Sequence, residues 1–176
     1  CGYLIVQSAL TDLQIEILRK SIDETYASNK EEFIHQLLEK DDRFAFLLDN
    51  PPVLCRMKAI LGNAIQLHSA TARVTEPGAS EQDWHRDGPW PVDPTGTPLG
   101  SAPGQINCAY YLDELTCKVG PIAVVPGSQH APFRPPKGRP EFPDELRLLS
   151  KPGQAVMFNG WLYHRSLANL SQHRRR

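Results

Sequence analysis

The chain of 176 residues has few cysteines, no long apolar run and almost no net charge. Its cysteines (Cys1, Cys55, Cys108 and Cys117) show no paired spacing, so we expect reduced thiols and a cytoplasmic location rather than disulfides or cysteine-bound zinc. No apolar run approaches the roughly 18 residues that indicate a membrane span, and no signal-peptide pattern is visible. The formal net charge of -1 gives no argument for nucleic acid or an anionic membrane as a partner.

The remaining composition is typical of a globular protein, with 40% apolar and 22% charged residues. Composition leaves the oligomeric state open between a monomer and a dimer. The length suits a single domain over residues 1–176. Because the chain stops abruptly after three arginines, we expect its C-terminal end to be truncated. The 16 prolines lie mostly between residues 77 and 152, which indicates stiff loops around an all-β core.

The first third of the sequence is predicted to be mainly helical. Thr11 and Gln14 have the spacing of a capping box, and Ile15, Leu18 and Ile22 then form one apolar helix face. We expect these helices to pack against a sheet and support it.

Two further helices are expected. The first covers residues 30–40 and would bury Phe33, Leu37 and Leu38. The second covers residues 51–61, because a Pro-Pro pair favours a helix start and the glycine that follows favours a helix end.

From residue 64 the pattern changes to short strands and turns. Strands are predicted at residues 2–6, 65–74, 105–115, 122–125, 146–149, 154–158 and 161–168. The Pro- and Gly-rich segment 89–104 is too long for a simple connector and is predicted to be a lid or a binding loop. Helices followed by strands predict an α+β fold, with a helical part at about 11–62 and a jelly-roll-like β-barrel at about 64–176.

The segment Trp-His-Arg-Asp-Gly at 84–88 carries the clearest chemistry. In an extended chain, His85 and Asp87 point to the same side, so an imidazole and a carboxylate converge. Such a pair is two thirds of the facial triad that holds non-haem Fe(II), and His164 is the candidate for the third ligand. A His-x-Asp pair also occurs by chance, and a distant histidine is often an ordinary strand residue.

Arginines and tryptophans add weaker candidates. The run Arg174–Arg176 follows His164, and a buried guanidinium there would match a carboxylate cosubstrate, although composition alone favours a solvated basic tail. Trp84, Trp90 and Trp161 are candidates for the lining of a substrate pocket, with core packing as an equal alternative for each.

Five segments carry a resemblance to a known family. They are residues 84–88, 110–113 (Tyr-Tyr-Leu-Asp), 120–130 (Gly-Pro-Ile-Ala-Val-Val-Pro-Gly-Ser-Gln-His), 153–158 (Gly-Gln-Ala-Val-Met-Phe), and 164–171 with the arginines beyond. With them the sequence resembles the phytanoyl-CoA dioxygenase family of Fe(II)/2-oxoglutarate oxygenases. The resemblance covers nearly the whole chain, and the Pro-Gly-Ser-x-His and distal His-to-Arg segments are its most specific parts.

The resemblance implies a double-stranded β-helix, with iron held by His85, Asp87 and His164 and chelated by 2-oxoglutarate, leaving a position for O2. It also implies that the far carboxylate of 2-oxoglutarate pairs with Arg175, eleven residues beyond His164, with Arg174 as the neighbouring alternative.

Ser166 lies two residues after His164 on the same strand face, and either binds the same carboxylate or is an ordinary strand serine. The implied reaction is hydroxylation of an unactivated C–H bond of a small-molecule substrate, or a related oxidation, with release of succinate and CO2. The presence of Asp87 argues against a halogenase, which lacks this carboxylate.

Two other functions stay open: a metal-binding cupin-type barrel without 2-oxoglutarate chemistry, and a non-catalytic sensor or binding module. No motif identifies the substrate.

Overall fold

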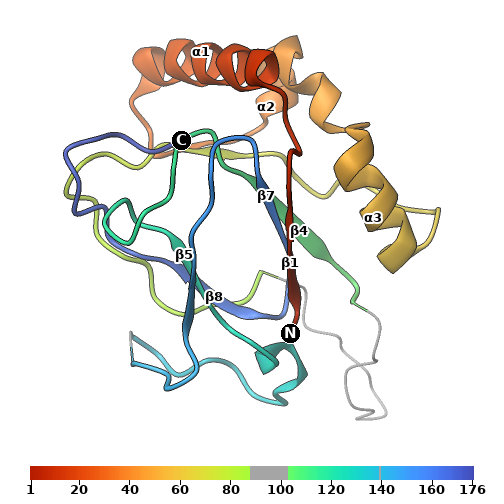
Figure 1. The fold of residues 1–176 in the computed structure, drawn as a ribbon, viewed down its shortest axis with the longest axis vertical. Helices are drawn as coiled ribbons and strands as arrows, with labels where there is room; N and C mark the ends of the chain where they lie inside the picture. The colour runs from red at the N-terminus through yellow and green to blue at the C-terminus, as the bar shows by residue number, and fades with distance from the viewer. Residues whose placement is uncertain (88–102, 139) are drawn as a thin grey trace.

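A computed structural model describes residues 1–87, 103–138 and 140–176 of the chain, which contain both helices and antiparallel strands (Figure 1). The elements are β1 (Tyr3–Val6), α1 (Asp12–Asn29), β2 (Phe33–Ile34), α2 (Leu37–Lys40), the 3-10 helix η1 (Asp42–Leu47), α3 (Pro51–Leu61), β3 (Ala72–Arg73), β4 (Ile106–Tyr110), β5 (Ile122–Val125), the 3-10 helix η2 (Ser128–His130), β6 (Leu146–Leu148), β7 (Ala155–Asn159) and β8 (Tyr163–Ser166). Apart from β1, β2 and the short η2, the helices precede the strands, as expected.

The strands form two three-stranded antiparallel sheets, in the orders β1-β7-β4 and β6-β5-β8, and β2 pairs with β3. The sheets pack against each other through buried side chains from both, including Val124 of β5 and Val156 of β7, which are both fully buried. All four residues of β5 are buried, as its continuous apolar run predicts. The predicted edge strand at 2–6 is confirmed as β1, at the edge of its sheet beside β7.

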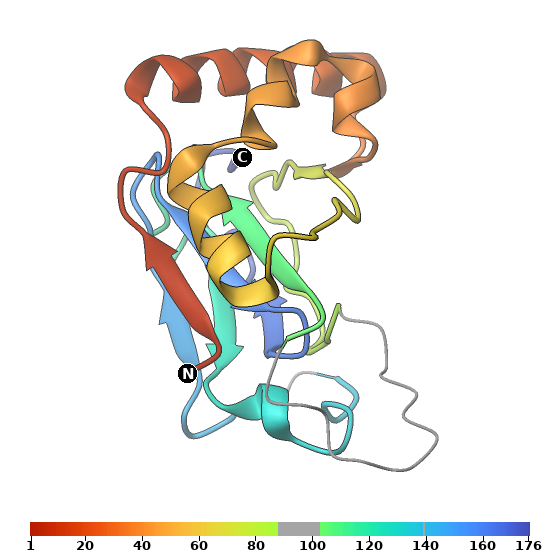
Figure 2. The ribbon, with the colours of Figure 1, turned by 90° about the vertical axis from the view of Figure 1, so that its right-hand side faces the viewer.

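The helices cover one end and one face of this sheet pair. Helix α1 lies across one end of the strands, and the C-terminal end of the chain lies beneath it in both views (Figures 1 and 2). Helix α3 covers the β1-β7-β4 sheet, where Val53 and Met57 pack against Met157 of β7. In the described part of the chain, no helix combines the length and the apolar character that crossing a membrane requires.

The start of α1 matches its sequence signal. The Thr11 hydroxyl accepts a hydrogen bond from the Gln14 amide at 3.3 Å, and the Gln14 side chain accepts one from the Thr11 amide at 2.9 Å. Ile15, Leu18 and Ile22 are buried in the core beneath α1, so both the capping box and the apolar face are confirmed.

The predicted helix at 30–40 is wrong. Helix α1 continues to Asn29 and ends at Lys30, whose φ of 52° is left-handed. Residues Phe33–Ile34 then pair with Ala72–Arg73, and a single helical turn follows as α2. This strand pairing joins residues about 40 positions apart, so no local pattern could reveal it.

The side chains of this segment also differ from expectation. Leu37 is buried as predicted, whereas Phe33 is exposed and Leu38 is only partly buried. Phe33 lies under the guanidinium of Arg73, 5.2 Å from the ring centroid, so its ring packs on a cross-strand neighbour rather than in the core.

Most strands are shorter than predicted, and two of them by five residues or more. Only Ala72–Arg73 of the segment 65–74 forms a strand, and the strand predicted at 105–115 is observed as Ile106–Tyr110. Residues 65–71 have no strand partner among the described residues, and strand-favouring side chains alone do not form a strand without one. The loop predicted at 89–104 falls almost entirely outside the described residues.

Gly120, which begins the turn into β5, provides a test of this packing. Its φ is +69°, and a Cβ added there would lie 2.7 Å from the backbone oxygen of Leu167. We expect Gly120→Ala to lower the free energy of unfolding by about 2–4 kcal/mol, from backbone strain and overpacking together. Gly78→Ala is the matched control, because φ there is +82° with no atom within 4 Å of the added Cβ. Gly78→Ala should lower the free energy of unfolding by only about 1–2 kcal/mol. Urea titration of both variants measures the two losses, and equal losses would contradict the packing argument.

Candidate metal centre

Backbone pairing brings His85 and His164 together from opposite ends of the strand region. The two residues form an antiparallel bridge, with the His85 amide donating to the His164 carbonyl at 3.1 Å and the reverse bond at 3.2 Å. Their ring centroids are 4.3 Å apart. The Asp87 amide donates to the Gly160 carbonyl at 2.8 Å, which continues the pairing past the turn before β8.

The three side chains converge as the spacing predicts. Asp87 lies with one carboxylate oxygen 3.6 Å from Nε2 of His85 and the other 3.2 Å from Nε2 of His164. One ligand atom from each residue lies within 4.8 Å of the others, and the described residues contain no second such group. Neighbouring ligands around one ion at about 2.1 Å are about 3 Å apart, so the three side chains fit a shared metal ion with small adjustments.

Both histidines are held in the tautomer that a metal ligand needs. Nδ1 of His85 lies 2.9 Å from the Asp83 carbonyl, and Nδ1 of His164 lies 2.9 Å from the Leu162 carbonyl. A carbonyl only accepts, so each Nδ1 carries the proton and each Nε2 lone pair faces the centre.

Electrostatics favour the ligating protonation states at two of the three residues. Burial, and then the neighbouring His164, lower the pKa of His85, which favours the neutral imidazole. Burial opposes ionisation of Asp87, but the close imidazoles of His164 and His85 and the hydrogen bond from Asn107 outweigh it and lower the pKa of the carboxyl. His164 is buried, whereas the side chains of His85 and Asp87 are 36% and 41% exposed, so the centre opens on the side of these two residues.

Asn107 of β4 is a member of the site that the sequence analysis missed. Its amide donates to the Asp87 carboxylate at 2.6 Å, and the Gln105 side chain donates to the Asn107 oxygen at 2.9 Å. Two polar side chains at i and i+2 on one strand share a face, and this spacing was the available signal. Asn107 fixes one carboxylate oxygen and leaves the other for a metal ion.

One turn anchors both ligand-bearing segments. The guanidinium of Arg86, between the two ligands His85 and Asp87, donates to the carbonyls of Ser128 and Ala131 at 2.9 and 2.8 Å. The Ser128 hydroxyl accepts a hydrogen bond from the Tyr163 amide at 2.7 Å, next to His164. The Pro-Gly-Ser-x-His segment therefore fastens the two halves of the centre to each other.

Arg175 is buried at 4% exposure, and Ser166 lies beside it. One terminal nitrogen donates to the Ser166 hydroxyl at 3.2 Å and to the Gly120 carbonyl, and the other donates to the Thr75 hydroxyl at 2.7 Å. All of these partners are neutral, and among the described residues no carboxylate forms an ion pair with Arg175. Burial lowers the pKa of Arg175. A buried guanidinium usually has a counter-ion, so this environment fits a carboxylate ligand.

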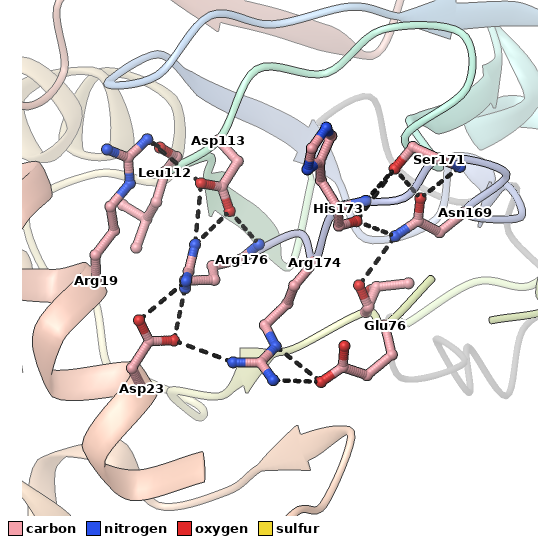
Figure 3. Close-up of polar contacts among 11 residues, drawn as sticks. Arg19, Asp23, Glu76, Leu112, Asp113, Asn169, Ser171, His173, Arg174 and Arg176 are labelled. Carbon is pink, nitrogen blue, oxygen red and sulfur yellow. Dashed lines mark hydrogen bonds and ion pairs between the residues drawn. The ribbon is translucent and has the colours of Figure 1, made fainter. Parts of the chain in front are cut away.

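Arg174 points the other way. Its guanidinium lies 2.6 Å from the Glu76 carboxylate and 3.6 Å from that of Asp23 (Figure 3). It also lies over the ring of Tyr26. Strand alternation thus directs Arg175 inward and Arg174 outward, and the arginine run is not a solvated tail. The binding role of either residue stays a prediction.

The tryptophans divide between the core and the undescribed segment. Trp84 is 4% exposed, donates to the Pro140 carbonyl at 2.9 Å and lies under the Arg165 guanidinium, 4.6 Å from its ring centroid. Trp161 is also buried, and Trp90 lies outside the described residues. The contacts of Trp84 are those of a core residue, and its predicted contact with a substrate remains untested.

Metal binding at this centre should depend on pH. We expect affinity to fall as the pH drops through and below about 6.5, because protons then compete with the metal for Nε2 of the histidines. The lowered pKa of His85 keeps that ligand neutral to a lower pH than an unperturbed histidine, so its share of the loss occurs later. Titration with Ni(II) between about pH 5 and about pH 7.5 measures this, and a flat profile would contradict histidine ligation.

Comparison with known proteins gives consistent matches. The chain is 26% identical over 216 aligned residues to L-proline trans-4-hydroxylase from Streptomyces griseoviridis, covering 99% of this chain and 79% of the relative. It is 34% identical over 117 residues to dioxygenase hkm4 from Aspergillus hancockii, covering 66% of this chain and 37% of the relative.

Solved structures share the fold. HygX from Streptomyces hygroscopicus, with nickel and 2-oxoglutarate bound, has a TM-score of 0.79 at 14% identity, over 99% of this chain and 79% of its own. The non-heme alpha ketoglutarate dependent carbocyclase SnoK from nogalamycin biosynthesis has a TM-score of 0.76 at 19% identity, over 99% and 76%. The family model for phytanoyl-CoA dioxygenase (PhyH) matches residues 1–176, so the resemblance in the sequence is confirmed and the chain belongs to this family of Fe(II)- and 2-oxoglutarate-dependent oxygenases.

Proposed function

We propose that this protein hydroxylates an unactivated C–H bond of a small molecule, converting 2-oxoglutarate and O2 to succinate and CO2. The observation that carries the proposal is a pair of features that meet on β8: the His85–Asp87–His164 cluster, which includes His164 of β8, and the buried guanidinium of Arg175 beside Ser166 of the same strand. We further propose that residues 1–176 form one domain and that its two sheets are the two sides of a double-stranded β-helix.

His85, Asp87 and His164 would hold Fe(II), which when bound supplies the activation of O2 coupled to decarboxylation of 2-oxoglutarate. The donor set fits this metal, with two neutral imidazoles and one carboxylate that leave other coordination positions open. Asn107 holds the second oxygen of Asp87, and the carbonyls behind the histidines keep their rings aimed inward.

Arg175 and Ser166 would bind the far carboxylate of 2-oxoglutarate. The guanidinium fork matches a carboxylate, and its burial strengthens the ion pair by excluding water. Thr75 holds one terminal nitrogen of Arg175 and the Gly120 carbonyl holds the other, which restricts the direction of the fork. Arg174 is the alternative, but its guanidinium is already paired with the carboxylates of Glu76 and Asp23. It is therefore directed away from the metal centre and is a poorer candidate for binding a further carboxylate.

The substrate would approach from the exposed side of Asp87. The proline hydroxylase among the relatives supports a small-molecule substrate. SnoK, which shares the fold, is a carbocyclase, so the fold alone does not fix the reaction. A carboxylate at position 87 occupies the place that a halide would need, which favours hydroxylation over halogenation.

The direct test is succinate formation by the full chain with Fe(II), 2-oxoglutarate and O2 across a panel of amino acids and other small metabolites. We expect succinate release that requires all three components and is lost in His164→Ala. Metal binding without any succinate would favour the cupin-type barrel. Loss of both would favour a sensor or binding module.

Two matched arginine variants test the cosubstrate site. Arg175→Lys keeps the charge but loses the fork, so we expect 2-oxoglutarate affinity to fall roughly 10- to 100-fold, the equivalent of one or more charge-assisted hydrogen bonds. Arg174→Lys should change it little, and Fe(II) binding should survive in both. Anaerobic titration of the Fe(II) protein measures this. If Arg174→Lys is the damaging change, the two arginines were assigned in the wrong order.

A further inference from the structure

The two residues beside Arg175 are both tied to the same helix. Arg174 and Arg176 alternate with Arg175 along the chain, so their side chains lie on the opposite face from the buried guanidinium. Figure 3 shows both of them directed at Asp23, which lies on α1. The segment with the proposed cosubstrate arginine therefore rests against the helical part of the molecule.

Asp23 binds the two arginines in different ways. It accepts two hydrogen bonds from Arg176, from Nε to Oδ1 at 2.8 Å and from Nη2 to Oδ2 at 2.9 Å, which is a bidentate pair. Its Oδ1 also lies 3.6 Å from Nη1 of Arg174. The carboxylate of Asp23 thus contacts the residues on both sides of Arg175.

A second carboxylate fixes the same segment from the other side. Asp113 accepts from the backbone amide of Arg176 at 2.7 Å and from its side chain at 3.2 Å, and it pairs with Arg19 of α1 at 3.3 Å (Figure 3). The Leu112 amide donates to the Arg176 carbonyl at 3.2 Å. Arg176 is held between Asp23 and Asp113, so its backbone is restrained as well as its side chain.

We propose that Asp23 is a positioning residue for the cosubstrate site: by holding Arg174 and Arg176, it fixes the direction in which Arg175 presents its guanidinium. The inference rests on the proposed role of Arg175 in binding 2-oxoglutarate. It assigns helix α1 a part in cosubstrate recognition, beyond support of the sheets.

The energetics point to a local effect. The Asp23 side chain is 41% exposed, and ion pairs of such exposure add little to global stability. In contrast, a misdirected Arg175 guanidinium would lose hydrogen bonds to the 2-oxoglutarate carboxylate, and the strength of these bonds depends on geometry. That carboxylate would be buried, so the loss would not be made up by water. Removing Asp23 should therefore affect binding at Arg175 more than it affects folding.

The experiment compares two 2-oxo acids on the Fe(II)-loaded full chain without oxygen. 2-Oxoglutarate has a distal carboxylate, whereas pyruvate has the same 2-oxo acid end and none. We expect Asp23→Asn to weaken 2-oxoglutarate binding roughly tenfold, the scale of a lost supporting contact, and to leave pyruvate binding unchanged. Glu24→Gln is the matched control, because Glu24 is the next residue of α1 and pairs with Arg43 and Lys20, away from Arg175. It should change neither affinity.

The outcomes separate the two proposals. If Asp23→Asn lowers the affinity for 2-oxoglutarate and pyruvate equally, the substitution disrupts the site in general and the inference fails. If Asp23→Asn leaves 2-oxoglutarate affinity unchanged while Arg175→Lys lowers it, the role of Asp23 is refuted and that of Arg175 stands. If Arg175→Lys has no effect either, the cosubstrate site itself is refuted. Should Asp23→Asn fail to fold, Arg176→Gln removes the same bidentate pair and should show the same selective loss; an unselective loss there would overturn the inference.

Discussion

The pairing of residues 75–87 with residues 160–175 is the constraint on which the rest of the structure depends. The contacts run antiparallel from Thr75 with Arg175, through Gln82 with Ser166, to His85 with His164. Because side chains alternate along an extended segment, a slip of one residue at the first bridge would turn Arg175 away from the interior, and a slip at the last would turn His164 away from His85. The pairing of these two segments therefore places both the metal centre and the arginine beside it.

The buried charge of Arg175 is the costly part of this arrangement. Among the described residues, only hydroxyls and a carbonyl bind this guanidinium, so within them it gives up hydration without the compensation of an ion pair. The neighbouring Arg174 and Arg176, on the outer face, do have carboxylate partners. This contrast within the described part of the chain supports the proposal that Arg175 receives its anion from a ligand.

Local features of the chain could be predicted, and features that depend on distant partners could not. The capping box at Thr11, the continuous apolar run of β5 and the i, i+2 pair of His85 and Asp87 are each contained within a few residues. The helix expected at 30–40 failed because residues Phe33–Ile34 take a strand partner far along the chain. Asn107 was missed for a related reason: its role appears only when β4 lies beside Asp87. The prediction that His164 joins His85 and Asp87 rested on the family resemblance as much as on the residues themselves.

The two ends of the paired segment are anchored by different parts of the molecule. The turn at Ser128 fastens the histidine end, and α1 fastens the arginine end through Asp23. Between them, Ser166 lies two strand residues from His164, about 6.5 Å along the same face. With both of its ends anchored, the paired segment holds the metal centre and the guanidinium at a set separation. That separation, rather than either group alone, is what would distinguish a five-carbon 2-oxo diacid from shorter or longer acids, because only a ligand of matching length reaches both groups without moving either anchor.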